Sequence, residues 1–219
     1  MLYDNNRYLR KLAKLLGFER AYIGEIRCPR FVEYYWAIQN LNCPPGRVLD
    51  VGSTGSLFPI LLASLGYEVY SIDVREYEWK VHPNMITVVG DIRDTKFPND
   101  FFDQVTAIST IEHIGLGRYG DPLDPCGDRK ALLEIARILK PNGKLLMTVP
   151  FGRRALSKLH RVYDKKALET LTKGFKVEKT EFFRIKDDYW FYSKEEELIS
   201  VDSSKRERAI VCMRLSKTS

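Results

Sequence analysis

The sequence predicts an α/β protein built on an open, doubly wound and mostly parallel sheet. Between residues 47 and 149, short apolar segments alternate with segments of helical periodicity. Parallel strands need a crossover connection, which is usually a helix, so this alternation indicates parallel pairing. Two strand-like segments end the chain with no helical pattern between them, only the charged stretch 187–206, and they should pair antiparallel.

The elements can be placed in order along the chain. Short apolar segments mark the strands, and apolar residues at helical spacing mark the helices. Gly66 ends the first helix of this region, and the turn 140–143 leads into the fifth strand. We expect strands at 48–51, 68–73, 85–89, 103–108, 144–149, 176–183 and 208–215, and helices at 57–65, 130–139 and 164–171.

The first 46 residues read as helices. Apolar side chains recur at helical spacing over 8–16, and Gly17 should end that helix. A second helix should begin at Arg30 or Phe31, after Pro29, and end near Leu41, before the breaking segment 43–46 (CPPG). We therefore expect an N-terminal helical cap over 1–46 and an α/β domain over 47–219.

Composition narrows the function classes. The 219 residues carry a net charge of +6, and residues 153–219 hold 17 basic against 11 acidic side chains. Because acidic residues interrupt this basic excess, a solvated surface of mixed charge is favoured, and a nucleic-acid partner is possible but not favoured. No apolar run is long enough for a membrane span, and the charged N-terminus is unlike a signal peptide, so we expect a cytoplasmic protein.

A glycine-containing turn follows the first expected strand, in the sequence 48–56 (VLDVGSTGS). In open α/β sheets, ligands bind at the carboxyl ends of the strands, where glycine lets the backbone approach the ligand. The turn lacks the G-x-G-x-x-G spacing of nicotinamide-dependent oxidoreductases, which argues against that class. A tight strand-to-helix turn can also use glycine for geometry alone.

Acidic residues stand near the ends of three successive expected strands. Asp50 lies two residues before Gly52 and suits a cationic group; Asp73, 21 residues after Gly52, can accept from both hydroxyls of a ribose. Asp91 follows the third strand and can accept from an adenine amino group. Each acid alone could be a helix cap or turn former, but their joint placement indicates a nucleoside-binding site.

These motifs resemble those of class I S-adenosylmethionine-dependent methyltransferases. Residues 49–55 (LDVGSTG) resemble the first signature motif of that family, 71–73 (SID) its second-strand acid, 90–92 (GDI) its adenine-site motif, and 138–144 (ILKPNGK) the turn before its fifth strand. The resemblance implies a seven-stranded sheet in the order 3-2-1-4-5-7-6, with the last strand antiparallel. It also implies S-adenosylmethionine as the cofactor, held by Asp50, Gly52, Ser53, Thr54, Gly55, Asp73, Val74, Asp91, Ile92 and Ser109.

The sequence departs from that family where Thr54 and Ser56 replace the usual glycines. Their hydroxyls could donate to the methionine carboxylate or cap the helix, and a non-catalytic cofactor-binding protein is one alternative that the departure leaves open.

The fourth expected strand ends near Glu112 and His113, where such enzymes meet the methyl acceptor. His113 has a pKa suited to taking a hydroxyl proton, with Glu112 as an orienting partner or a surface residue; a packing role is the alternative for the histidine. His160, after the fifth strand, could also border the acceptor or be an exposed loop residue. Two clustered ligands fall short of a usual metal site, so no metal is expected.

The loop 115–128 holds four glycines and two prolines, which forbid a regular helix. Long irregular segments in compact domains often act as lids. Similar loops in microbial methyltransferases, some near glycan biosynthesis, indicate a small-molecule or sugar-like hydroxyl as acceptor; an RNA or protein acceptor is the alternative.

Overall fold

The computed structural model describes residues 28–42, 44–79, 81–187, 189–202 and 208–218. Their main feature is an eight-stranded sheet in the order β3-β2-β1-β4-β5-β10-β8-β9. Its strands are β1 (Arg47–Val51), β2 (Glu68–Asp73), β3 (Met85–Val89), β4 (Phe102–Ile108), β5 (Leu139–Phe151), β8 (Phe175–Lys186), β9 (Tyr189–Ser193) and β10 (Ala209–Lys217). A separate two-stranded hairpin joins β6 (Ala155–Leu156) to β7 (Arg161–Val162).

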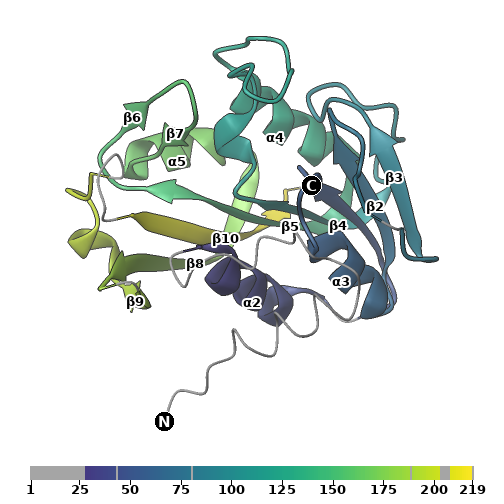
Figure 1. Cartoon of the computed structure of the whole chain (residues 1–219), viewed down its shortest axis with the longest axis horizontal. Coiled ribbons are helices and arrows are strands. Elements are labelled where there is room, and N and C mark those ends of the chain that lie inside the picture. The colour runs from purple at the N-terminus through teal and green to yellow at the C-terminus, as the bar shows by residue number, and fades with distance from the viewer. Residues whose placement is uncertain (1–27, 43, 80, 188, 203–207, 219) are drawn as a thin grey trace.

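Helices cover both faces of the sheet (Figure 1). Helices α2 and α3 pack on one face, and α4 and α5 on the other. Their bounds are α2 (Arg30–Asn40), α3 (Phe58–Ser64), α4 (Gly127–Ile138) and α5 (Lys165–Leu171), with short 3-10 turns η1 (Ile111–His113) and η2 (Glu195–Glu197). Within the described residues, no helix is both long enough and apolar enough to cross a membrane.

The pairing confirms the predicted doubly wound sheet. Strands β1 to β5 pair parallel, and β10 pairs antiparallel with both β5 and β8. With β8 as the sixth main strand and β10 as the seventh, the order is the expected 3-2-1-4-5-7-6. Successive side chains along a strand point to opposite faces of the sheet, so Leu145 packs on the α4 side and Leu146 on the α2 side.

The eighth strand, β9, was not predicted. It pairs antiparallel with β8 inside the stretch 187–206, where the sequence indicated only a charged connection. The strand has residues of high β propensity, namely Tyr189, Trp190, Phe191 and Tyr192. It is short and flanked by charged residues, so the sequence pattern does not distinguish it from a connection.

The other boundaries lie close to their predicted places. Helix α2 begins at Arg30 as expected, whereas the helix predicted over 8–16 lies outside the described residues. The predicted turn at 140–143 is included in β5, where the register shifts because Phe102 pairs with Leu139 but Gln104 with Lys144. The intervening residues therefore bulge out of the ladder, which preserves a turn within a continuous strand.

Candidate functional site

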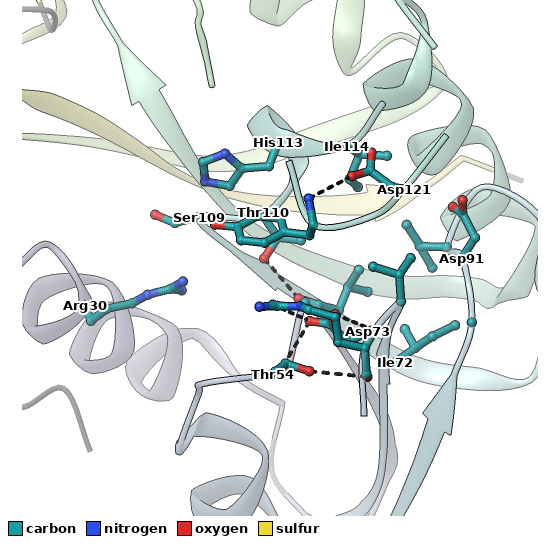
Figure 2. Close-up of a pocket in the computed structure, with 17 residues that line it drawn as sticks. Arg30, Thr54, Ile72, Asp73, Asp91, Ser109, Thr110, His113, Ile114 and Asp121 are labelled. Carbon is teal, nitrogen blue, oxygen red and sulfur yellow. Dashed lines mark hydrogen bonds and ion pairs between the residues drawn. The ribbon is translucent and has the colours of Figure 1, made fainter. Parts of the chain in front are cut away.

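A well-formed pocket lies at the carboxyl ends of the parallel strands. It encloses about 640 Å³, part of which is open to solvent. Figure 2 shows Arg30 reaching in from α2, Asp91 on the opposite side, and Ser109 and His113 above Thr54 and Asp73. Of the predicted site residues, the pocket brings together Gly52, Thr54, Asp73, Val74, Asp91, Ile92, Ser109 and His113.

The turn after β1 requires glycine at one position in particular. Gly52 has a φ of +77°, and its N–H donates to the carbonyl of Ile72 at 2.8 Å. A Cβ at this position would lie 2.5 Å from both Cγ2 and Oγ1 of Thr110. Gly55 also has a φ of +77°, but no atom lies within 4 Å of the place where its Cβ would be. Of the two glycines, Gly52 alone packs tightly against Thr110, which follows β4.

The two residues that depart from the glycine pattern bind the protein itself. The Thr54 hydroxyl donates to the Glu76 carbonyl at 3.2 Å, and Ser56 Oγ accepts the N–H of Phe58, the first residue of α3, at 3.2 Å. Ser56 also shares a hydrogen bond of 2.8 Å with the Tyr34 hydroxyl. Of the three hydroxyl-bearing residues in this turn, only Thr54 lines the pocket, because Ser53 and Ser56 are buried beside it.

Asp73, at the end of β2, faces the Gly52 turn. Its Oδ2 accepts the backbone N–H of Thr54 at 3.0 Å, and its Oδ1 accepts the backbone N–H of Arg75 at 3.0 Å. The Arg75 guanidinium adds bonds of 3.1 Å to Oδ1 and 3.3 Å to Oδ2. A carboxylate has about four acceptor directions, so Asp73 is saturated by backbone and guanidinium together.

Asp91 lies at the rim beyond β3. Its carboxylate accepts three side-chain bonds from Arg93, and although burial opposes the charge, these bonds lower the pKa of Asp91. The apolar wall on this side is formed by Ile72, Val74 and Ile92. An aromatic ring could lie against this wall with a charged acceptor at its edge.

Asp50 does not line the pocket. Its side chain is buried within the sheet and accepts a 2.6 Å hydrogen bond from the Thr106 hydroxyl. Burial raises the pKa of Asp50 to about 7 against the effect of that bond. The sequence placed Asp50 against the ligand, whereas the structure places it in the layer below the turn.

His113 faces the pocket from η1 and is held by one ring nitrogen. Its Nδ1 lies within hydrogen-bond distance of the Leu159 carbonyl, which can only accept, so Nδ1 carries the proton and Nε2 has the free lone pair. Burial, assisted by the charge of Arg118, lowers the pKa of His113 to about 4. The imidazole is therefore neutral at physiological pH and able to take a proton at Nε2.

The other two predicted residues of the acceptor side lie behind and beside His113. Glu112 is buried, not at the surface, with its Oε1 3.6 Å from His113 Nε2, and burial raises its pKa to about 8. His160 packs edge-on to His113, with ring centroids 6.3 Å apart. Neither lines the pocket itself.

A buried polar layer contributed by α2 lies under this end of the site. Glu33 Oε1 accepts from the hydroxyls of Ser109 and Thr148, while Glu33 Oε2 and Glu112 Oε2 have no hydrogen-bond partner. The Arg30 guanidinium, which donates to the Ile108 carbonyl, provides the nearby positive charge. Helix α2 is thus part of the site, and sequence reasoning missed its two charged residues because they lie before the glycine-rich motif.

The loop predicted as a lid does border the pocket. Asp121 organises it by accepting the N–H groups of Gly115 at 2.6 Å and Tyr119 at 3.3 Å. The Tyr119 ring lies 4.4 Å under the Arg75 guanidinium and 5.6 Å from the His113 ring. The sequence indicated the loop but not these residues, because nothing in its spacing singles out Tyr119 or Asp121.

The fold is that of class I S-adenosylmethionine-dependent methyltransferases, as comparison with solved structures shows. A methyltransferase from Methanosarcina mazei superposes with a TM-score of 0.61 at 15% identity, covering 83% of this chain and 97% of that one. The 1,6-didemethyltoxoflavin-N1-methyltransferase of Burkholderia thailandensis, solved with 1,6-didemethyltoxoflavin and S-adenosylhomocysteine, gives 0.58 at 13% identity, covering 99% and 89%.

The chain belongs to the family described as Caenorhabditis protein of unknown function, DUF268, whose model matches residues 65–214. No curated protein sequence matches it significantly. A further similar structure, the (4+2)-cyclase SpnF, has a TM-score of 0.61 at 15% identity and covers 86% of this chain and 80% of its own. Because its name denotes a different reaction, function has to be argued from the site.

Proposed function

We propose that this protein transfers a methyl group from S-adenosylmethionine to a hydroxyl of a small molecule, such as a sugar or glycan precursor. The observation that carries the proposal is a single pocket in which the Gly52 turn, Asp73 and the Ile92 wall meet at the strand ends, with His113 at the other side. In open α/β sheets this edge is where nucleoside ligands bind.

The residues of the pocket fit this cofactor. Asp73 can accept ribose hydroxyls once they replace the Arg75 guanidinium, whose side chain is 40% exposed and free to leave. The wall of Ile72 and Ile92 suits adenine, and the Arg30 guanidinium suits the methionine carboxylate. When bound, S-adenosylmethionine would supply an activated methyl group, which the acceptor oxygen takes as the sulfur leaves with the bonding electrons.

His113 would receive the hydroxyl proton at Nε2. A hydroxyl oxygen becomes strongly acidic as it gains a methyl group, so even a histidine of low pKa suffices as the base. Keeping His113 neutral has a second advantage, because a neutral imidazole does not repel the positive charge of the methyl donor. The main contribution of the protein is then to align the two reactants and exclude water.

The cofactor assignment can be tested by calorimetric titration with S-adenosylhomocysteine and, separately, with NAD. We expect binding of the first only, with at least tenfold weaker binding in Asp73→Ala. Asp94→Ala is the matched control, because Asp94 is an exposed carboxylate whose side chain is 86% accessible. Binding of NAD alone, or unchanged affinity in Asp73→Ala, would overturn the assignment.

The role of His113 can be tested by turnover. Release of S-adenosylhomocysteine is followed with a panel of hydroxyl-bearing sugars and sugar phosphates, and the best acceptor is then used with His113→Gln. We expect kcat to fall at least tenfold with little change in cofactor affinity, whereas His82→Gln, which alters a half-buried histidine outside the pocket, should leave kcat unchanged. Full turnover by His113→Gln would remove the histidine from the mechanism.

A further inference from the structure

Four exposed basic residues lie on segments near His113 and His160, at the acceptor end of the pocket. Arg154 and Lys158 are exposed on the β6–β7 hairpin, Arg118 is exposed on the lid loop, and Arg208 is exposed before β10. Figure 1 shows the hairpin beside α5, at the same side of the sheet as the loop that enters α4. These four residues, with His160, form what we call the basic rim.

The contacts around His113 connect the basic rim to the site. Arg118 donates to the Leu159 carbonyl at 3.3 Å, which is the carbonyl that holds His113 Nδ1. Leu159 lies in the hairpin, and Ser157 closes its tip by donating to the His160 carbonyl at 3.1 Å. His113, Arg118 and the hairpin are therefore neighbours through one shared backbone oxygen.

The basic rim lacks neutralising partners. Among the described residues, Arg118, Arg154, Lys158 and Arg208 form no ion pair, in contrast to Arg153, which pairs with Asp202 at 3.0 Å. Glu112, on which the charge of Arg118 acts, is largely protonated because burial raises its pKa to about 8. Burial, together with the charges of Arg118 and Arg208, lowers the pKa of His160.

Uncompensated cations beside a cavity attract an anion from solution. A phosphate group carries about −1.5 to −2 charges at neutral pH and accepts several charge-assisted hydrogen bonds, so it satisfies such a group of arginines better than a carboxylate does. A surface that only needed solubility would mix both signs.

We propose that the methyl acceptor carries a phosphate group, which the basic rim of Arg118, Arg154, Lys158, His160 and Arg208 binds while its hydroxyl faces His113. This inference rests on the proposed methyl transfer, and it narrows the acceptor to a phosphorylated molecule. The phosphate can belong to a water-soluble molecule or to a lipid headgroup, since both present the same group to the rim.

The test uses inorganic pyrophosphate and the three histidines of the chain as site-specific probes. Proton NMR titration of the full-length protein, saturated with S-adenosylhomocysteine, follows His82, His113 and His160 at constant ionic strength. We expect pyrophosphate to shift the His160 resonance and raise its pKa, because a bound anion favours the imidazolium, and to leave His82 unchanged.

Two charge-neutralising variants provide the comparison. Arg154→Gln/Lys158→Gln should weaken pyrophosphate binding at least tenfold, whereas Lys96→Gln/Lys176→Gln removes the same charge from exposed positions elsewhere and should not. Affinity for S-adenosylhomocysteine should be unchanged in both. If the nucleoside binds but pyrophosphate perturbs no histidine, the phosphate inference fails while the proposed function stands; if the nucleoside does not bind, the proposed function fails.

Two further arms separate the sources of the phosphate. The phosphate would be assigned to a lipid headgroup if the protein responds to pyrophosphate and also sediments with phosphatidylglycerol vesicles but not with phosphatidylcholine vesicles. The pyrophosphate response without vesicle binding would assign it to a soluble molecule. A third outcome would overturn the inference in favour of a nucleic-acid acceptor. In that outcome the natural chain binds an RNA oligonucleotide but does not respond to pyrophosphate, and the Arg154→Gln/Lys158→Gln variant no longer binds the RNA.

Discussion

The Arg75 guanidinium occupies two acceptor directions of the Asp73 carboxylate, with Nε 3.1 Å from Oδ1 and Nη2 3.3 Å from Oδ2. The other two directions are taken by the backbone N–H groups of Thr54, after β1, and Arg75, after β2. A ribose that binds Asp73 therefore competes with Arg75, whose guanidinium lies over the Tyr119 ring of the lid. The pair links the ligand site to the loop that covers it.

This competition predicts that Arg75→Ala binds S-adenosylhomocysteine more tightly than the natural chain. In this variant the ribose no longer has to break the bonds between Arg75 and Asp73. We therefore expect the binding free energy to improve by roughly 1 kcal/mol, or about fivefold in Kd. Calorimetric titration measures it. Weaker binding in Arg75→Ala would mean that the arginine contacts the nucleoside rather than competing with it.

The close approach of Gly52 to Thr110 predicts a large penalty for a side chain at this position. Gly52→Ala combines an unfavourable positive φ with a contact of 2.5 Å, so we expect it to lower the free energy of unfolding by roughly 2–4 kcal/mol. Gly55→Ala is the matched control, because it has the same φ of +77° and open space around its Cβ, and should cost about 1 kcal/mol.

Urea unfolding of both variants measures this difference. Thr110→Ala in the Gly52→Ala background should recover part of the loss, because it removes both clashing atoms. Equal destabilisation by the two glycine substitutions would show that backbone strain alone sets the cost and that the contact with β4 contributes nothing.

The burial of Glu112 leads us to predict that the stability of the folded protein depends on pH. Burial raises the pKa of Glu112 from 4.5 to about 8, so the folded protein holds a proton that the unfolded chain releases above pH 4.5. The contribution of Glu112 to stability is therefore fully present below pH 4.5 and is lost as pH rises through about 8. Glu112→Gln keeps the protonated shape at all pH values and removes this loss.

Relative to Glu112→Gln, the natural chain should thus lose roughly 4 kcal/mol of unfolding free energy between pH 4.5 and pH 9. Urea unfolding at a series of pH values measures the difference between the two proteins. Comparing the pair cancels the contributions of titrating groups that do not contact Glu112. A difference that does not change with pH would show that the pKa of Glu112 is the same in the folded protein as in the unfolded chain.

The strands and the edge of the sheet that holds the pocket were predicted from the sequence for a physical reason, whereas the order of the strands followed from the resemblance to a known family. Strand ends, glycine turns and acids such as Asp73 obey local rules that hold at short sequence distance. Arg30, Arg75 and Tyr119 could not be placed this way, because they meet only when α2, the end of β2 and the lid loop fold onto one edge. The burial of Asp50 beside Thr106 could not be read from its nearness to Gly52, because strand alternation sets the direction of its side chain.

The lid loop predicts a local effect of Asp121. Its carboxylate accepts N–H groups from Gly115, Gly117 and Tyr119, and these bonds hold the Tyr119 ring beside the pocket. Asp121→Ala should therefore speed amide hydrogen exchange across 115–121 by at least tenfold and weaken S-adenosylhomocysteine binding several-fold, because the disordered loop must be ordered again on binding.

Amides of β4 and β5 should exchange in Asp121→Ala at the same rate as in the natural chain. The matched control for amide exchange is Asp124→Ala, since the Asp124 carboxylate accepts the Cys126 N–H at 3.0 Å and pairs with Lys130 and Arg93, at the other end of the loop from the bonds that Asp121 accepts. Faster exchange in β4 as well would mean that Asp121 supports the whole fold, and the loop could then not be treated as a separate lid.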